Sequence, residues 1–296
     1  MDESDEIYEE KFEKLLIGVK NFSENLKKED NFLIISHIDA DGIASCAIII
    51  DLLKFLNKKF SFVNIKQLYE ETIKEISLEE KINSIIFTDM GSGQIDIINK
   101  ISEFQNKKIF IIDHHQPKLE HLTEKINNIY HLNPFIYGID GSFEISASGM
   151  CYLVAKSLGR IDMVDIAIVG AVGDTQDSSG KLIGANRKIL EDGKNNNIIK
   201  FKKDIRLFGR ESRPLVYMLA YSSDPFIPDL TGNVDACKEF LHSIGIKILN
   251  ENSDNGKWIS YVDLSFEDRK KLVSALYEKI LIYDEISANS LIGEVY

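Results

Sequence analysis

Five short apolar runs, separated by stretches of helical periodicity, constrain the fold of this chain more than any other feature. The runs cover residues 32–36, 60–65, 84–88, 108–112 and 128–132. Helices are expected around and between them, at 5–28, 42–56, 94–105, 148–158 and 164–172. Strands that alternate with helices call for a parallel sheet with both faces covered by helices. The sequence therefore predicts an α/β domain over residues 1–195.

The composition changes after about residue 195, where an Asn triplet and a Lys-rich stretch (200–203) are typical of a surface connector. Helices are predicted at 214–222, 233–244 and 265–282, and a short strand near 258–261. Tyr217 and Tyr221 are four residues apart, which favours one packed face of the first of these helices. We expect residues 196–296 to form a smaller, mostly helical connector and accessory region.

Metal-binding residue types follow three of the predicted strands and one predicted helix. In chain order they are His37, Asp39 and Asp41; Asp89; Asp113, His114 and His115; and Asp174. In open parallel sheets, ligands bind outside the carboxyl ends of the strands, so these side chains are expected to meet at one edge. Asp177 competes with Asp174 for the last position, although the Gly-Asp context favours Asp174.

So many carboxylates at one edge would repel one another unless cations neutralise them. His37, Asp39 and Asp41 alternate, so they converge if the chain stays extended past the strand; taken alone, the stretch is equally compatible with a polar turn. Imidazole and carboxylate donors suit Mn²⁺ or Mg²⁺ better than a thiolate zinc site. Two such ions stabilise an in-line displacement at phosphorus, so the sequence favours hydrolysis of phosphoesters.

Composition narrows the cellular setting and the partners. No apolar run approaches the roughly 20 residues of a membrane span, and the acidic N-terminus is unlike a signal peptide. Cys46, Cys151 and Cys237 form no CxxC pair, so we expect free thiols and a cytoplasmic location. The net charge of −12 argues against non-specific adhesion to nucleic acid. A locally basic stretch nevertheless contains Arg210 and Arg213, which either bind phosphate or form structural salt bridges.

The four motifs, in this order, resemble the DHH phosphoesterases, a family named for the triplet found here at residues 113–115. The resemblance covers roughly residues 30–180 and implies a hydrolase with two ions, Mn²⁺ or Mg²⁺. It assigns one ion to His37 and Asp39, the other to Asp41, His114 and Asp174, and a bridging position to Asp89. It further implies that His115 contacts phosphate or donates a proton, and that Asp113 orients a histidine.

Within that family, the His-x-Asp-x-Asp spacing at 37–41 is similar to nucleases of the RecJ type. Residues 208–214 and 221–228 resemble the segment after the DHH domain in archaeal RecJ-like proteins. Those proteins include a nuclease associated with the GINS replication complex and are related to the DHH subunit of the eukaryotic replicative helicase. The resemblance implies a single-strand exonuclease on DNA or RNA, with a replisome component such as GINS as partner.

Two other functions remain open on the sequence. A phosphodiesterase of nanoRNA or cyclic dinucleotides would use the same chemistry, and a non-catalytic replication scaffold would keep the fold. RecJ-type enzymes also carry a C-terminal DHHA1-type domain with a Gly-Gly-Gly-His segment, which does not occur before Tyr296. We therefore expect that domain to be absent, either because the protein is short or because the chain is truncated.

Overall fold

The computed structural model describes residues 3–69, 71–72, 82–100, 104, 106–122, 128–249 and 258–296, in two compact units. The first unit consists of Met1–Ser178 with Leu182–Lys200. The second consists of Ser179–Lys181 with Phe201–Tyr296. Part of the helix expected at 94–105 lies outside the described residues; its described part is α4 (Ile95–Lys100).

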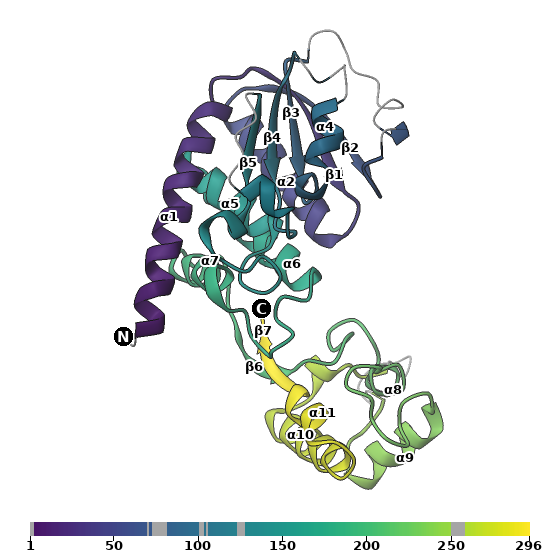
Figure 1. Ribbon diagram of the computed structural model, residues 1–296. Coiled ribbons are helices and arrows are strands. Elements are labelled where there is room, and N and C mark those ends of the chain that lie inside the picture. The colour runs from purple at the N-terminus through teal and green to yellow at the C-terminus, as the bar shows by residue number, and fades with distance from the viewer. Residues whose placement is uncertain are drawn as a thin grey trace. The chain divides into compact units, whose positions relative to one another are not determined.

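The first unit is built on a five-stranded, all-parallel sheet with the strand order β2-β1-β3-β4-β5 (Figure 1). The strands are β1 (Asn31–His37), β2 (Lys59–Ile65), β3 (Ser84–Thr88), β4 (Lys108–Ile112) and β5 (Ile129–Leu132). Every residue of β3 is buried. This burial explains the continuous apolar run, since a central strand of a parallel sheet faces helices on both sides. The predicted fold class is confirmed.

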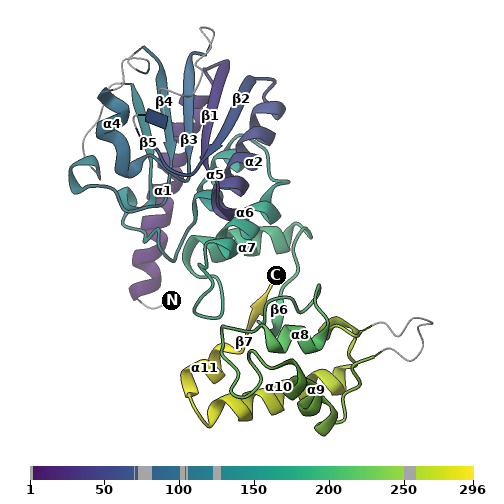
Figure 2. The ribbon, with the colours of Figure 1, turned by 90° about the vertical axis from the view of Figure 1, so that its right-hand side faces the viewer.

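Helices cover both faces of this sheet (Figure 2). The helices of this unit are α1 (Glu3–Leu26), α2 (Ala40–Phe55), α4, α5 (Ala147–Ser157), α6 (Val164–Gly173) and α7 (Gly184–Asn195), with the 3-10 turns η1 (Ser92–Gln94), η3 (Leu119–Leu122) and η4 (Pro134–Tyr137). On one face, Ile95 and Ile98 of α4 share a core cluster with Ile109 of β4. The next strand residue, Phe110, faces the other way and contacts Phe22 of α1, with ring centroids 5.5 Å apart.

Helix α2 begins directly after β1, and its start corrects one expectation. The sequence places the helix start at Gly42, with residues 37–41 extended, whereas the helix begins at Ala40 and Asp39 caps it. A Cβ atom at Gly42 would lie 2.4 Å from the carbonyl oxygen of His37, so only glycine fits this tight passage from strand to helix. Asp41 therefore belongs to the first helical turn, and its side chain departs from the direction of the strand.

The second unit has its own small sheet and core. The strands β6 (Lys202–Ile205) and β7 (Ile292–Val295) pair antiparallel, and the helices are α8 (Leu215–Ala220), α9 (Val234–Ser243), η5 (Tyr261–Asp263), α10 (Phe266–Leu281) and α11 (Glu285–Ser290). Two sequence expectations are wrong here. Lys202 and Lys203 lie in β6 and not in a connector, because the distant β7 pairs with them. Trp258 and Ser260 form isolated bridges, and the chain then turns into η5.

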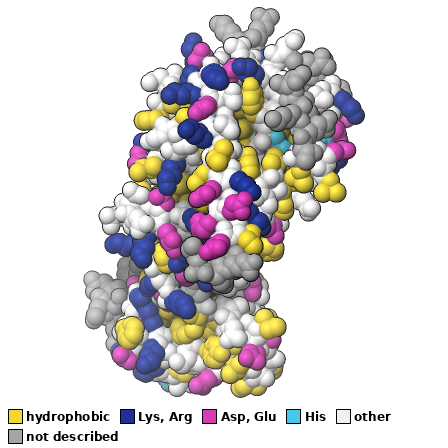
Figure 3. Space-filling model, turned by 60° about the vertical axis from the view of Figure 1, so that its left-hand side comes forward, with side chains coloured by type: hydrophobic (Ala, Val, Ile, Leu, Met, Phe, Trp, Pro, Cys, Tyr) yellow, Lys and Arg dark blue, Asp and Glu magenta, His cyan; other side chains and the backbone are white. Residues whose placement is uncertain are grey.

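Surface and thiol features complete the fold. Lys and Arg side chains on the face drawn in Figure 3 are scattered and alternate with Asp and Glu. Cys46, Cys151 and Cys237 are buried free thiols, as expected. In the part of the chain that the structure describes, no helix combines the length and the apolar character needed to cross a membrane.

Candidate metal centre

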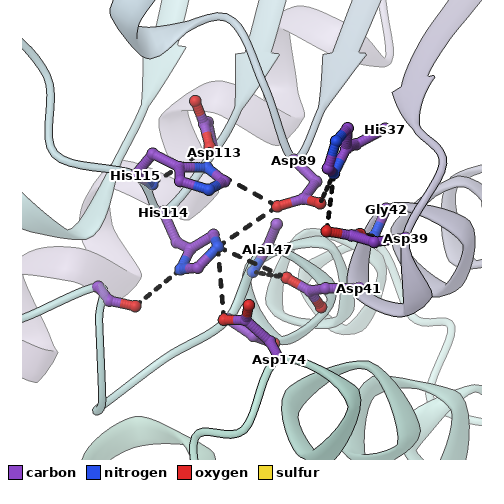
Figure 4. Close-up of polar contacts among 12 residues, drawn as sticks. His37, Asp39, Asp41, Gly42, Asp89, Asp113, His114, His115, Ala147 and Asp174 are labelled. Atoms are coloured by element: carbon purple, nitrogen blue, oxygen red, sulfur yellow. Dashed lines mark hydrogen bonds and ion pairs between the residues drawn. The ribbon is translucent and has the colours of Figure 1, made fainter. Parts of the chain in front are cut away.

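The carboxyl end of β1 contributes the first group of candidate ligands. Nδ1 of His37, the last residue of β1, lies 2.7 Å from Oδ2 of Asp39 and 3.4 Å from Oδ2 of Asp89 (Figure 4). Asp39 is the N-cap of α2, and its Oδ1 accepts a hydrogen bond of 2.9 Å from the backbone N–H of Gly42. The cap therefore fixes the carboxylate beside the imidazole and leaves its other oxygen available.

Asp41 is held from the opposite side by another helix. Its two oxygens accept the backbone N–H groups of Ala147 and Ser148, at 2.8 and 3.0 Å, in the first turn of α5. These amides and the dipole of the 11-residue helix favour a negative charge there. The side chain is only 1% exposed, and this burial raises its pKa. A Cβ atom at Gly170 of α6 would lie 2.6 Å from Oδ1 of Asp41, so the site requires glycine there.

Asp89 lies between the two groups of ligands (Figure 4). It follows β3 with a φ of 59°, a left-handed conformation that Asp tolerates better than most residues. Its Oδ2 faces His37, while its Oδ1 lies 3.3 Å from Nε2 of His114. Burial, together with the charges of Asp41 and Asp113, raises its pKa to about 8. One carboxylate thus faces two imidazoles on opposite sides, which is the arrangement that a bridging ligand requires.

His114 presents one ring nitrogen to three carboxylates. Its Nδ1 lies 2.7 Å from the carbonyl oxygen of Gly141, which can only accept, so Nδ1 carries a proton and Nε2 faces the acids. Nε2 lies 3.3 Å from Asp89, 3.6 Å from Asp174 and 3.8 Å from Asp41. Although burial of the ring lowers its pKa, the carboxylate of Asp89 beside Nε2 and the charge of Asp41 outweigh this and raise it to about 10.

Asp113 and His115 form a pair at the edge of the site. Nδ1 of His115 lies 2.8 Å from Oδ1 of Asp113, whose Oδ2 accepts the backbone N–H of Ser92 at 2.9 Å. Burial opposes ionisation of Asp113, but the His115 bond and the charges of both histidines hold its pKa at about 2. In turn, the bond to Asp113 raises the pKa of His115, whose side chain is 57% exposed. Asp113 therefore orients His115 and favours its protonated form.

The rings of the adjacent residues His114 and His115 lie next to each other. In a continuing strand, His114 and His115 would point to opposite sides, but β4 ends at Ile112 and the chain leaves the sheet. Both rings consequently turn toward the same region, with centroids 4.4 Å apart. Both can then face one substrate.

Unpaired buried atoms test whether the site fits cations. Among the described residues, four buried side-chain atoms of this centre make no hydrogen bond: Nδ1 of His37, both oxygens of Asp89 and Nε2 of His114. Leaving such atoms unsatisfied costs roughly 1–3 kcal/mol each. All four are good ligands for divalent cations and converge on a small volume. Ligand atoms within 4.8 Å of one another form three groups: His37, Asp39 and Asp89; Asp41, His114 and Asp174; and Asp89, His114 and His115. The site therefore fits divalent cations.

The sequence did not reveal the side chains that support this centre. Gln176 is 2% exposed and donates from Nε2 to the carbonyl of Gly141 at 2.9 Å and to Oδ2 of Asp174 at 3.0 Å. Buried Asn186 of α7 in turn donates to Gln176. Gln176 thus couples the carboxylate of Asp174 to the carbonyl that orients His114. No motif signals it, because the carbonyl of Gly141 that it binds lies 35 residues away in the chain.

A second network lies behind His115. Asn133 donates from Nδ2 to the hydroxyl of Ser92 and to the backbone oxygen of His115, both at 2.9 Å. Ser92 also lies 2.8 Å from Nε2 of His131, whose pKa burial lowers to about 4. His131 is thus a neutral, mostly buried member of this network.

The remaining candidate site residues belong to none of the ligand groups of this metal centre. Asp177 belongs to none of the ligand groups found among the described residues, whereas Asp174 does. Arg210 is engaged in ion pairs with Asp204 at 3.3 Å and Glu211 at 3.0 Å, which matches the structural role considered for it. Arg213 instead packs on the ring of Phe208.

Comparison with known proteins follows the same division of the chain. Residues 31–171 match the family described as DHH family, N-terminal domain. They form a DHH-family domain. Residues 207–291 match the DHH-CID domain, so the second unit also has a counterpart among DHH proteins.

Similarity to two known proteins extends over most of this chain. An uncharacterized protein of Methanocaldococcus jannaschii is 35% identical over 268 residues, which cover 88% of this chain and 59% of that protein. CDC45 from Entamoeba histolytica has a similar fold, with a TM-score of 0.63 and 18% identity, over 96% of this chain and 58% of CDC45. This chain thus spans less than two thirds of either relative.

A lower similarity is found to a crystal structure of exonuclease RecJ bound to manganese. Its TM-score is 0.47 with 16% identity, over 93% of this chain and 63% of that one.

Proposed function

We propose that the chain is a two-metal phosphodiesterase that degrades single-stranded nucleic acid from an end, as RecJ-type exonucleases do. The observation that carries this proposal is the convergence of unpaired ligand atoms from His37, Asp89 and His114 at the carboxyl edge of the sheet. Such a cluster is costly without cations, so it favours a metal-dependent enzyme over a protein that merely keeps the fold.

The ligand groups support the division between two ions that the family resemblance implies. His37 and Asp39 would hold one ion, Asp41, His114 and Asp174 the other, and Asp89 would bridge them. When bound, a pair of divalent cations, Mn²⁺ by preference or Mg²⁺, supplies an activated water and positive charge for the phosphoryl group. The buried amides of α5 keep Asp41 in place, and Gln176 keeps Asp174 oriented toward the same point.

His115 is the proposed catalytic acid. The contact of Nδ1 with Asp113 raises the pKa of His115 and so favours the protonated ring, and the exposed part of that ring can reach a substrate. The ring would donate a hydrogen bond to a phosphoryl oxygen and pass a proton to the oxygen that leaves phosphorus. Asp113 positions that ring and retains its own negative charge throughout.

Digestion of end-labelled single strands tests the proposal. Full-length protein with Mn²⁺ is incubated with DNA and RNA oligonucleotides labelled at either end. We expect mononucleotides to appear from one end and Asp41→Ala to release none. Asp96→Asn is the matched control, because Asp96 belongs to a second His/carboxylate group, with Glu120 and His121, outside the proposed centre. Full activity in Asp41→Ala, or loss of activity only in the control, would place the chemistry elsewhere.

The two alternatives give different results in the same experiments. A phosphodiesterase of nanoRNA or cyclic dinucleotides would cleave a dinucleotide faster than a long strand. A replication scaffold, which would bind a replisome component such as GINS, would show neither cleavage nor binding of Mn²⁺ in a calorimetric titration.

A further inference from the structure

An arginine lies between two exposed aromatic rings in the second unit. The guanidinium carbon of Arg213 is 4.7 Å from the ring centroid of Phe208 and 5.8 Å from that of Tyr221. Phe208 is 76% exposed and Tyr221 60% exposed. The ring of Tyr221 stacks on Tyr217 at 5.7 Å, and Tyr217 contacts Trp258 at 5.8 Å. These five side chains form a run of neighbouring planar groups, which we call the aromatic ladder.

The backbone is shaped to present this ladder. The carbonyl oxygen of Gly209 accepts the backbone N–H groups of both Ser212 and Arg213, at 3.2 and 2.8 Å, which makes a tight turn. Gly209 has a φ of +84°, and a Cβ atom there would lie 2.5 Å from Cδ of Arg213. Only glycine therefore lets the Arg213 stem cross the turn and reach the ring of Phe208.

Helix α8 supplies the other end of the ladder. Its buried residues, which face the core, are Leu215, Val216, Met218, Leu219 and Ala220. Tyr217 is only partly buried, and Tyr221, its C-cap, is exposed. The two tyrosines were expected to mark a packed helix face, but they lie on the side of α8 that the core leaves open. Large rings kept exposed at such a position leave apolar surface that a planar ligand can contact, and Phe208 is the most exposed of them.

The charge of the ladder favours an anionic partner. Arg210 is engaged by Asp204 and Glu211, whereas the side chain of Arg213 makes no ion pair or hydrogen bond within the part of the chain that the structure describes. Residues 200–213 contain six Lys or Arg and two acidic residues, although the whole chain has a charge of −12. Flat apolar faces beside an uncompensated guanidinium match unpaired bases joined by phosphates. Duplex bases are already stacked and would leave the rings unused.

We propose that Phe208, Arg213 and Tyr221 form a stacking platform for a single strand of nucleic acid on the second unit. Phe208 stacks on one base, the exposed part of the Tyr221 ring packs against the next, and Arg213 contacts the intervening phosphate. The proposal names a binding surface for the substrate class of the proposed function and in that respect rests on it. The binding itself requires neither metal nor hydrolysis.

Fluorescence anisotropy with labelled oligothymidylate, measured on the full chain in EDTA, tests the platform. Removing one base-stacking ring is expected to raise the Kd by about 5- to 100-fold in Phe208→Ala and in Tyr221→Ala. Phe266→Ala is the matched control, because Phe266 is a 78% exposed ring of the same unit outside the ladder, and its Kd should stay within about twofold. Arg213→Gln should reduce the slope of log K against log salt by about 0.7.

Equal Kd values for the ladder variants and the control would overturn the platform, as would the absence of binding by the wild type. A protein partner that requires these rings, found while the nucleic-acid Kd is unchanged, would also overturn it. EDTA keeps this test separate from catalysis. Binding that depends on the ladder without any cleavage in Mn²⁺ would refute only the proposed hydrolase, and cleavage without ladder dependence would refute only the platform.

Discussion

Replacing Asp89 by Asn should change stability in opposite directions without and with metal. The carboxylate is 2% exposed, and its pKa rises from the ordinary value of 3.8 to about 8. Between these values the folded protein holds a proton that the unfolded chain has released, so stability falls as pH rises, by up to about 1.4 kcal/mol per pH unit. Asn carries no such proton and, like Asp, tolerates the left-handed backbone at this position.

The expected size of this stability difference follows from the same two pKa values of Asp89. The difference between a pKa of 3.8 and one of about 8 corresponds to an upper bound of about 6 kcal/mol at pH 8.5. The positive charge of His114, 3.3 Å away, offsets part of this cost in the wild type. We therefore expect metal-free Asp89→Asn to be more stable than the wild type by roughly 2 kcal/mol at pH 8.5.

Binding of metal should reverse the order of stability, so that the wild type is more stable than Asp89→Asn. Mn²⁺ at 100 times its Kd stabilises the wild type by about 2.7 kcal/mol, and the variant, which lacks the shared ligand, gains little. Urea unfolding at pH 8.5, in EDTA and in Mn²⁺, measures both effects, with Asp96→Asn as a control that should respond to Mn²⁺ like the wild type. If Asp89→Asn is less stable than the wild type in EDTA, the carboxylate has a structural partner and the reasoning fails.

Three further predictions address the parts around this carboxylate. Gly170→Ala should weaken Mn²⁺ binding by at least tenfold in calorimetry, because the new methyl group displaces Asp41; unchanged affinity would show that the backbone relaxes. Asp113→Asn should lower the pKa of His115 and move the alkaline limb of the pH–rate profile to lower pH, and an unmoved limb would remove His115 as the acid. Binding of Mn²⁺ at pH 7 should release protons from His114, with its pKa of about 10, and from Asp89, with its pKa of about 8, and calorimetry in buffers of different ionisation enthalpy would count them; a count of zero would contradict the protonation described here.

The central part of the fold could be predicted because its signals are local. Each buried parallel strand is a continuous apolar run, and each ligand motif follows such a run directly, so Asp89 and residues 113–115 were assigned to the correct edge. The start of α2 was misplaced by two residues, because Asp39 both caps the helix and belongs to the ligand pattern. Because α2 begins two residues earlier, the Asp41 side chain points away from His37 and accepts hydrogen bonds from the backbone amides of α5.

Features that depend on distant partners could not be predicted. β6 is a short, Lys-containing segment that becomes a strand only because residues 292–295 pair with it. Gln176 gains its place through Gly141 and Asn186, which approach it only in the folded chain. The aromatic ladder brings together side chains from a glycine turn, a helix end and Trp258. In the sequence only the i, i+4 spacing of the two tyrosines is visible, and that spacing alone indicated a packed face.

Electron paramagnetic resonance of the wild type titrated with Mn²⁺ tests most directly whether Asp89 is shared by two ions. Two ions about 3.5–4 Å apart are close enough for magnetic exchange. We predict that two equivalents bind per chain and give the multiline spectrum of a coupled pair. Binding of a single equivalent with an isolated six-line spectrum, or no binding at all, would contradict the two-metal centre.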